Sequence, residues 1–201
     1  MDRKILWVGV ASILLIGGAI LLTRAFAEPP SFRGTAYSEP YPPAPTIELR
    51  QANGATFRLS DQNGKVVLIF FGFTSCPDVC PTTLAELNMA LNDMSADPKD
   101  VQVLFISVDP QRDTPEKIQE YVERFNGTYT GLSGSLEELQ PIWQGYGVFR
   151  EVVLGSTAMD YTVNHTARVI LIDPQGNMRL SYGFQTPPED IANDIDILLT
   201  Q

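Results

Sequence analysis

Thiol and imidazole side chains are scarce in this sequence of 201 residues. It has two cysteines, Cys76 and Cys80, and one histidine, His165. A structural disulfide usually ties distant segments, because closing a very short loop removes little chain entropy. Cys76 and Cys80 enclose almost no loop, so we interpret them as candidates for redox or metal chemistry.

Basic residues are also few. The chain has 14 Lys and Arg against 24 Asp and Glu, which gives a formal net charge of −10. A surface with this excess of negative charge should repel nucleic acid and anionic lipid headgroups. We therefore expect no nucleic-acid partner. No internal repeat is visible.

An uncharged apolar run, Ile5–Leu22, follows two basic residues near the N-terminus. A transmembrane helix needs roughly 17 to 25 apolar residues, whereas the apolar core of a signal peptide has roughly 7 to 15. We therefore predict that residues 1–24 are a transmembrane anchor or an uncleaved signal, although Ala25-Phe26-Ala27 resembles a cleavage site. The basic flank keeps Met1 in the cytoplasm. The prediction is one pass through the inner (cytoplasmic) membrane with the domain in the periplasm, or in the mitochondrial intermembrane space of a eukaryote.

Residues 25–45 are rich in proline and poor in aliphatic side chains. This composition is typical of an extended, semi-rigid linker, so we expect the folded domain to span residues 46–201. Asn53-Gly54 and Asn63-Gly64 supply the positive φ of tight turns and predict hairpins at the start of this domain.

Val66–Phe71 is an unbroken apolar run, typical of a parallel strand that is buried on both faces, and Gly72 is expected to end it. Pro81 indicates the first turn of a helix, and Val101–Val108 is a second apolar strand. Such a βαβ unit has a right-handed crossover and both strand C-termini at one edge. The cysteines therefore lie at the helix N-terminus, which favours thiolate over thiol.

The remaining elements follow from caps and apolar runs. Thr114, Ser135 and Thr186 are predicted helix N-caps, the last two in capping boxes with Glu138 and Glu189. Further strands are expected at Tyr129–Leu132, Val148–Leu154, Val169–Ile172 and Met178–Phe184. The order predicts an α/β thioredoxin-like sandwich with an N-terminal hairpin, preceded by one transmembrane helix.

Cys76 and Cys80 are one helical turn apart, which places their Cα atoms roughly 6 Å from each other. The two sulfurs can form a disulfide or chelate one soft metal ion. Two thiolates alone leave Cu(I), zinc or an iron–sulfur cluster short of ligands. His165, expected in a loop just before Val169, is the candidate third ligand. Two sulfurs and one imidazole suit Cu(I), whereas zinc prefers four ligands.

Two aspartates are candidates for supporting roles. Asp78 lies between the cysteines and either favours the turn or tunes the thiols. Asp109 follows the second apolar strand, on the same edge as Cys76. It is either a turn residue before Pro110 or a group that orients a metal ligand.

Three segments, FFGFTSCPDVCPTTL, ISVDPQRDTPE and the NHT before RVILIDPQG, resemble the Sco/SenC family of copper-binding assembly factors for cytochrome c oxidase. The resemblance covers Thr46 to the C-terminus. It implies a thioredoxin-like domain that binds Cu(I) and Cu(II) through Cys76, Cys80 and His165. The aspartate of its DP-x-RDTP motif falls on Asp109, with a role in metal transfer or redox chemistry.

The resemblance implies a metallochaperone rather than an enzyme. It would accept copper from an upstream donor and deliver it to the binuclear copper site of cytochrome c oxidase subunit II, or to another copper acceptor. The alternative is a thiol-disulfide reductase that uses Cys76 and Cys80 to keep the acceptor cysteines reduced. Two features argue against general reductase activity. Many thioredoxin-like reductases carry a proline that faces the reactive cysteines just before the strand corresponding to Val169–Ile172, and Asn164–Ala167 has none. The cysteine spacing is also one residue wider than C-x-x-C.

Overall fold

The computed structural model describes residues 31–155 and 160–200. The predicted transmembrane segment 1–24 and the cleavage motif at residues 25–27 lie outside these ranges. Within them, every helix is too short or too polar to cross a membrane.

The core is a six-stranded sheet whose central strands are β4 (Val66–Gly72) and β5 (Val101–Ser107). They pair in parallel along their whole length, and all of β4 is buried, as the unbroken apolar runs predict. The strand order is β1-β10-β9-β4-β5-β6, with β6 parallel to β5 and β9 antiparallel to β4. The other strands are β6 (Thr130–Leu132), β9 (Val169–Ile172), β10 (Met178–Tyr182) and β1 (Thr35–Ala36).

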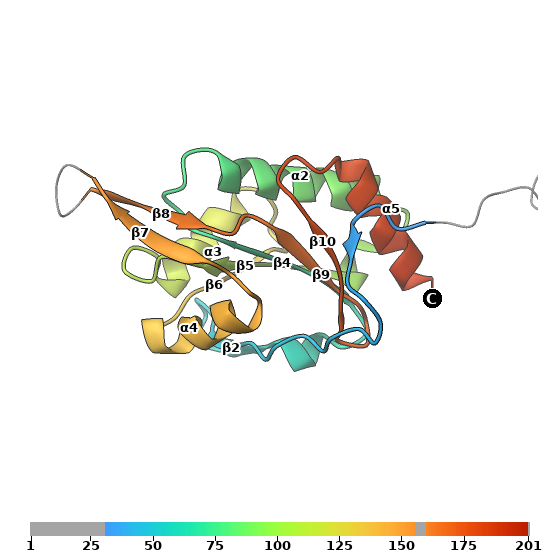
Figure 1. Cartoon of the computed structure of the whole chain (residues 1–201), viewed down its shortest axis with the longest axis horizontal. Helices are drawn as coiled ribbons and strands as arrows, with labels where there is room; N and C mark the ends of the chain where they lie inside the picture. Colours follow the sequence, from blue (N-terminus) through green and yellow to red (C-terminus); the bar gives the residue numbers. More distant parts are fainter. Residues whose placement is uncertain (1–30, 156–159, 201) are drawn as a thin grey trace, which may run out of the picture. The chain divides into compact units, whose positions relative to one another are not determined.

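Helices cover both faces of this sheet. Figure 1 shows α2 and α5 together on one face, with α4 and β2 on the other. The predicted α/β sandwich and its central βαβ unit are confirmed. The helices are α2 (Val79–Asp93), α3 (Pro115–Glu123), α4 (Leu136–Gly145) and α5 (Pro188–Leu199), with short 3-10 helices η1 (Leu59–Gln62) and η2 (Pro98–Asp100).

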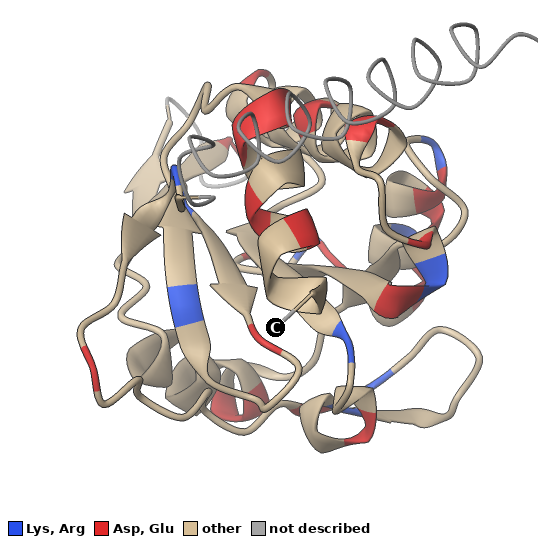
Figure 2. Ribbon diagram, turned by 90° about the vertical axis from the view of Figure 1, so that its right-hand side faces the viewer, with Lys and Arg blue, Asp and Glu red and all other residues tan. Residues whose placement is uncertain are grey.

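Acidic residues are spread over the helical surface. Figure 2 shows several of them along α5, the helix nearest the C-terminus, which contains no Lys or Arg. Four aspartates are exceptions, because Asp109, Asp113, Asp173 and Asp194 are buried.

Two small antiparallel hairpins flank the main sheet. β2 (Glu48–Arg50) pairs with β3 (Thr56–Arg58), and Gly54 in their turn has a φ of +82°. The N-terminal hairpin is therefore confirmed. The Asn63-Gly64 turn instead joins η1 to β4.

The sequence predicts only the first strand of the second hairpin. β7 (Arg150–Leu154) pairs with β8 (Tyr161–His165), and the register places Arg150 opposite His165. The expectation that His165 lies in a loop is wrong, because it is the last residue of β8. β8 contains polar residues at its exposed positions, and among residues 31–155 and 160–200 its one strand partner is β7, so it has no continuous apolar run.

The expected linker is a further correction. Residues from Phe32 onward belong to the same compact unit as the rest of the domain. Thr35–Ala36 forms edge strand β1 against β10, and Ala44 N–H donates to the Gly176 carbonyl at 2.9 Å. Proline tolerates such edge positions, where one side of the backbone needs no donor. The domain therefore begins at Phe32 rather than Thr46.

The start of α5 also differs from the prediction. Its N-cap is Pro187, which makes no side-chain cap, so the capping box of Thr186 and Glu189 is wrong. Proline fits the first helical turn, where an N–H is not needed, and Pro187-Pro188 therefore sets the start. The N-cap of Thr114 and the capping box of Ser135 with Glu138 are confirmed.

Asp194 of α5 holds the N-terminal segment in place. Its buried carboxylate accepts hydrogen bonds from the N–H groups of Arg33 (2.9 Å) and Gly34 (2.8 Å) and from the Tyr182 hydroxyl (3.1 Å). Arg33 also pairs with Asp190 at 2.7 Å, but this ion pair is partly exposed.

We expect Asp194→Ala to lower the free energy of unfolding by about 3 kcal/mol, because hydrogen bonds to charged groups are strong and three donors, one of them the buried Tyr182 hydroxyl, would lose them. Asp190→Ala is the matched control and should cost about 1 kcal/mol or less, since partly exposed ion pairs contribute little. Urea unfolding of both variants measures the difference. Equal losses would contradict the assigned role of Asp194.

Candidate metal centre

Cys80 is fully buried in the first turn of α2, against the C-terminal end of β4. A Cβ atom at Gly72 would lie 2.8 Å from Cys80 Sγ and even closer to the ring of Phe105. Only glycine leaves room for this close approach. Gly72 is also the last residue of β4, so strand pairing continues one residue beyond the predicted end.

Cys76 lies in the loop between β4 and α2 and is partly exposed. The two thiols are free, and the Cys80 N–H points at Cys76 Sγ at 3.4 Å. A hydrogen bond from the Cys80 thiol, aided by the N–H groups of Asp78 and Cys80, lowers the pKa of Cys76 to about 5. The same thiol hydrogen bond, together with burial, raises the pKa of Cys80 far above its usual range. The pair therefore holds one thiolate and one thiol.

His165 presents a neutral imidazole. Its ring packs edge-on against Phe73, with ring centroids 5.8 Å apart, and burial lowers its pKa. Nδ1 lies 3.1 Å from the Thr166 carbonyl oxygen. Because a carbonyl can only accept, Nδ1 carries the hydrogen and Nε2 keeps the free lone pair that a metal ion needs.

A pocket of about 190 Å³ lies between the cysteine loop and β8, and its lining includes Phe73, Cys76 and His165. The structure thus brings Cys76 next to Cys80 and places His165 across the pocket from Cys76. In residues 31–155 and 160–200, no three His, Cys, Asp or Glu side chains are close enough to hold one metal ion. The donor set of two sulfurs and one nitrogen suits a soft ion, but His165 must approach the sulfurs to complete it.

The two predicted supporting aspartates occupy different surroundings. Asp78 is the N-cap residue of α2, yet its exposed side chain makes no cap, and only its N–H acts on Cys76. Asp109 is fully buried; its carboxylate pairs with Arg112 Nε and accepts the Tyr161 hydroxyl at 2.7 Å. Asp109 therefore contacts the strand that carries His165 and has no hydrogen bond to either cysteine among those that the described residues form.

Sequence reasoning missed Asp113. Its buried carboxylate accepts the N–H of Thr74 at 3.1 Å and the hydroxyls of Thr74 at 2.5 Å and Ser107 at 2.8 Å. It thereby fixes the loop that carries Cys76, and burial raises its own pKa. The signal was present, because Asp113 follows Asp109 in the same DPQRD segment.

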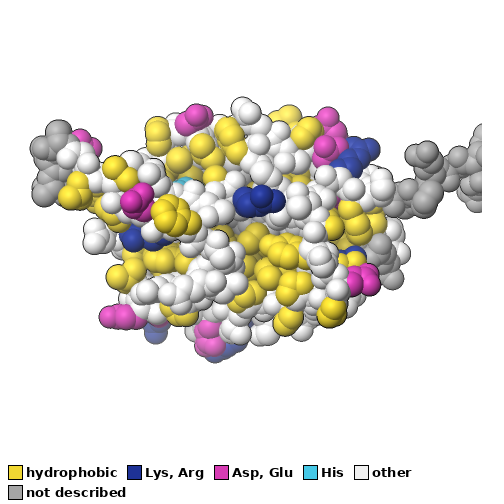
Figure 3. All heavy atoms as spheres, in the orientation of Figure 1, with side chains coloured by type: hydrophobic (Ala, Val, Ile, Leu, Met, Phe, Trp, Pro, Cys, Tyr) yellow, Lys and Arg dark blue, Asp and Glu magenta, His cyan; other side chains and the backbone are white. Residues whose placement is uncertain are grey.

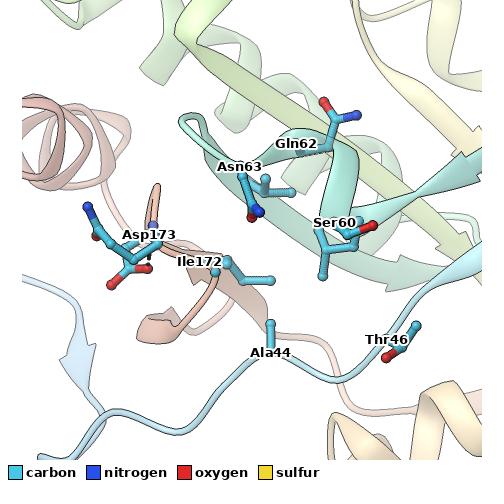
Figure 4. Close-up of a pocket in the computed structure, with 11 residues that line it drawn as sticks. Ala44, Thr46, Ser60, Gln62, Asn63, Ile172 and Asp173 are labelled. Atoms are coloured by element: carbon cyan, nitrogen blue, oxygen red, sulfur yellow. Dashed lines mark hydrogen bonds between the residues drawn. The ribbon is translucent and has the colours of Figure 1, made fainter.

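Another pocket, of about 220 Å³, lies near the N-terminal end of β4. Figure 4 shows its lining, which includes Ser60, Asn63 and Asp173. It contains neither a cysteine nor the histidine, and the cysteines are at the opposite end of β4. It is therefore separate from the candidate metal centre.

Comparison with known proteins gives one family. The SCO1/SenC family model matches residues 36–200. The mitochondrial protein SCO2 homolog of Bos taurus is 34% identical over 194 residues, which cover 90% of this chain and 69% of that protein. The SCO2-like protein of Rickettsia felis is 30% identical over 196 residues, covering 95% and 96% of the two chains.

A solved structure agrees with these sequence matches. The structure of Bradyrhizobium japonicum ScoI with copper bound is 37% identical and superposes with a TM-score of 0.71. The match covers 77% of this chain and 98% of that chain, so the two share the same thioredoxin-like α/β fold. The chain therefore belongs to the SCO1/SenC family.

Proposed function

We propose that this protein is a membrane-anchored copper metallochaperone of an extracytoplasmic compartment. It accepts copper from an upstream donor, binds it through Cys76, Cys80 and His165, and delivers it to the binuclear copper site of cytochrome c oxidase subunit II. Residues 1–24 supply the single transmembrane anchor, which keeps the domain in the periplasm or, in a eukaryote, in the mitochondrial intermembrane space.

The observation that carries the proposal is the pairing of two adjacent sulfurs with an imidazole across one pocket. Related proteins of this family have been solved with copper bound, including Bradyrhizobium japonicum ScoI and yeast Sco1. Thiolates and imidazole are the ligands that copper prefers.

The protonation states favour uptake at neutral pH. Cys76 is already a thiolate and His165 is already neutral, so both offer a lone pair. Cys80 holds its proton and must release it when its sulfur binds the ion. When copper passes to an acceptor, the Cys80 sulfur takes up a proton again, and this reprotonation weakens its hold on copper.

We expect His165→Ala to lower Cu(II) affinity by about tenfold or more and to change Cu(I) binding less, because Cu(II) depends more on nitrogen ligands. Competition titrations with each ion, together with the Cu(II) absorption spectrum, measure this. Asn164→Ala, on the exposed side of β8, is the control. An unchanged Cu(II) spectrum in His165→Ala would remove His165 from the site.

The asymmetry of the cysteines supports a second candidate, a thiol-disulfide reductase for the acceptor's copper-site cysteines. The partly exposed Cys76 thiolate would attack one sulfur of the acceptor disulfide and form a mixed disulfide. The Cys80 sulfur, after losing its proton, would then attack Cys76. The acceptor would leave with two thiols, and Cys76 and Cys80 would be oxidised to a disulfide.

Alkylation tests the asymmetry on which this candidate depends. We expect iodoacetamide to modify Cys76 and spare Cys80 in the folded, reduced protein, because only Cys76 is both accessible and ionised. The rate should fall to half its maximum near pH 5, as measured by peptide mass spectrometry. Cys76→Ser is the control and should react slowly. A midpoint near the ordinary thiol pKa of about 8.5 would contradict the assigned thiolate.

One experiment separates the two functions. The reduced full-length protein is titrated anaerobically with Cu(I), and X-ray absorption measures its coordination, while an oxidised acceptor peptide is tested for reduction in parallel. Tight binding by two sulfurs and one nitrogen without turnover supports the chaperone. Rapid reduction with negligible copper affinity supports the reductase and rules out the chaperone.

A further inference from the structure

His165 is carried by a hairpin that is joined to the core through side chains rather than through strand pairing. In the part of the chain that the structure describes, β7 and β8 pair with each other and with no strand of the main sheet. Figure 3 shows hydrophobic side chains exposed in this region of the surface. Leu154 of β7 is 71% exposed, and Phe149, just before β7, is 61% exposed. Val163 at the centre of β8 is buried in the core, but much of the rest of the hairpin is exposed, so side-chain contacts also hold it.

Arg112 makes the first of these contacts. Its Nη1 donates to the Tyr161 carbonyl of β8 at 3.0 Å, and its guanidinium lies 3.8 Å from the centre of the Tyr161 ring. Asp109 binds Arg112 Nε and also accepts the Tyr161 hydroxyl, so one carboxylate ties the arginine and the tyrosine together. This is a stacked, charge-assisted contact, the geometry in which arginine binds most strongly.

Arg150 makes the reciprocal contact from the other strand. Its Nε donates to the carbonyl of Val108, the residue just after β5, and its guanidinium lies 5.1 Å from the centre of the Trp143 ring. One arginine therefore reaches from the core to β8, and the other reaches from β7 to the core. We define Asp109, Arg112, Arg150 and Tyr161 as the hairpin clamp.

The clamp is linked to the imidazole in two ways. Successive residues of a strand alternate between its faces, so Tyr161 and His165 point to the same side of β8. The burial pattern agrees, since both are less exposed than Thr162 and Asn164. In addition, the Arg112 guanidinium lies 5.6 Å from the centre of the Phe73 ring, which packs against His165.

One buried donor of the Arg112 guanidinium is left without a hydrogen-bond partner among the described residues. This donor is Nη2. An unpaired buried donor has a cost, which the ion pair, the carbonyl contact and the two rings must offset.

We propose that Arg112 and Tyr161 are positioning residues that set the place of His165 relative to Cys76. The clamp fixes the Tyr161 end of β8, so the approach of His165 to the sulfurs needs only a local adjustment. The metal-binding part of this inference rests on the proposed function, whereas the position of the imidazole does not.

The single histidine gives a copper-free test, because the full-length chain has one set of imidazole NMR signals. In Arg112→Gln we expect these signals to shift as the imidazole leaves the Phe73 ring. The β8 amides should exchange with solvent about tenfold faster or more, the factor expected for losing a charged hydrogen bond. Tyr161→Phe, which keeps the ring and removes one hydrogen bond, should act in the same direction and replaces Arg112→Gln if that variant does not fold.

Arg179→Gln is the matched control. Arg179 pairs with Asp173 at 3.2 Å and lies 4.0 Å from the Tyr41 ring, so it repeats the ion pair and stacking of Arg112 away from the pocket. It should leave the imidazole signals and the β8 exchange unchanged.

Copper provides the second measurement. Arg112→Gln should lower Cu(II) affinity by about tenfold or more, the usual effect of removing a group that orients a metal ligand. The same substitution in a His165→Ala background should have no further effect, because it acts through the imidazole.

The outcomes are distinct. Unmoved imidazole signals in both clamp variants would overturn the inference, and so would an equal loss of Cu(II) affinity with and without His165. If the wild-type protein bound no copper, the proposed function would fail, and the imidazole signals and β8 exchange would decide the inference alone.

Discussion

The parallel pairing of β4 with β5 is the constraint on which the rest of the structure depends. Its register runs from Val66 opposite Val101 to Gly72 opposite Ser107, so both strands end at the same edge of the sheet. The cysteine loop leaves β4 at this edge, and the segment with Asp109 and Asp113 leaves β5 beside it. Both strands are closely packed on both faces, so the core resists displacement of the strand ends from which these loops leave.

Two buried carboxylates, Asp109 and Asp113, lie at this edge and set the charge around it. Asp109 is neutralised by Arg112, whereas Asp113 is held mainly by hydroxyl and amide donors, with Lys117 at 4.0 Å. The charge of Asp113 adds to the hydrogen bond and the burial that keep Cys80 protonated. Cys76 is partly exposed to solvent and receives the hydrogen bonds, so it becomes the thiolate. The asymmetry of the pair therefore comes from its surroundings, since the two residues are chemically identical.

The sequence predicts those parts of the fold that local patterns determine. The apolar runs identified β4 and β5, and short-range side-chain geometry identified the caps at Thr114 and Ser135. The failures share a different cause, which is dependence on distant contacts. Edge strand β1 forms because it pairs with β10 and because Asp194 binds the N–H of Gly34 beside it. Both partners lie more than a hundred residues further along the chain. The cysteines and His165 were identified as residue types, but Asp113 was missed, because its role depends on Thr74 and Ser107, which only the fold brings to it.

The location of His165 on a separate hairpin favours transfer over permanent storage. Cys80 is buried against Gly72, so its sulfur cannot move away without disturbing the core, whereas Cys76 lies in the loop between β4 and α2 and is partly exposed. The imidazole sits on a two-stranded element joined to that core mainly by side chains. If the protein acts as the proposed metallochaperone, an incoming ligand would displace the imidazole at the expense of a few polar contacts, while the sulfurs would still hold the ion. In the proposed metallochaperone, an imidazole that can be displaced before the sulfurs would permit exchange without release of free copper, whereas thiol-disulfide exchange alone would need no imidazole at this position.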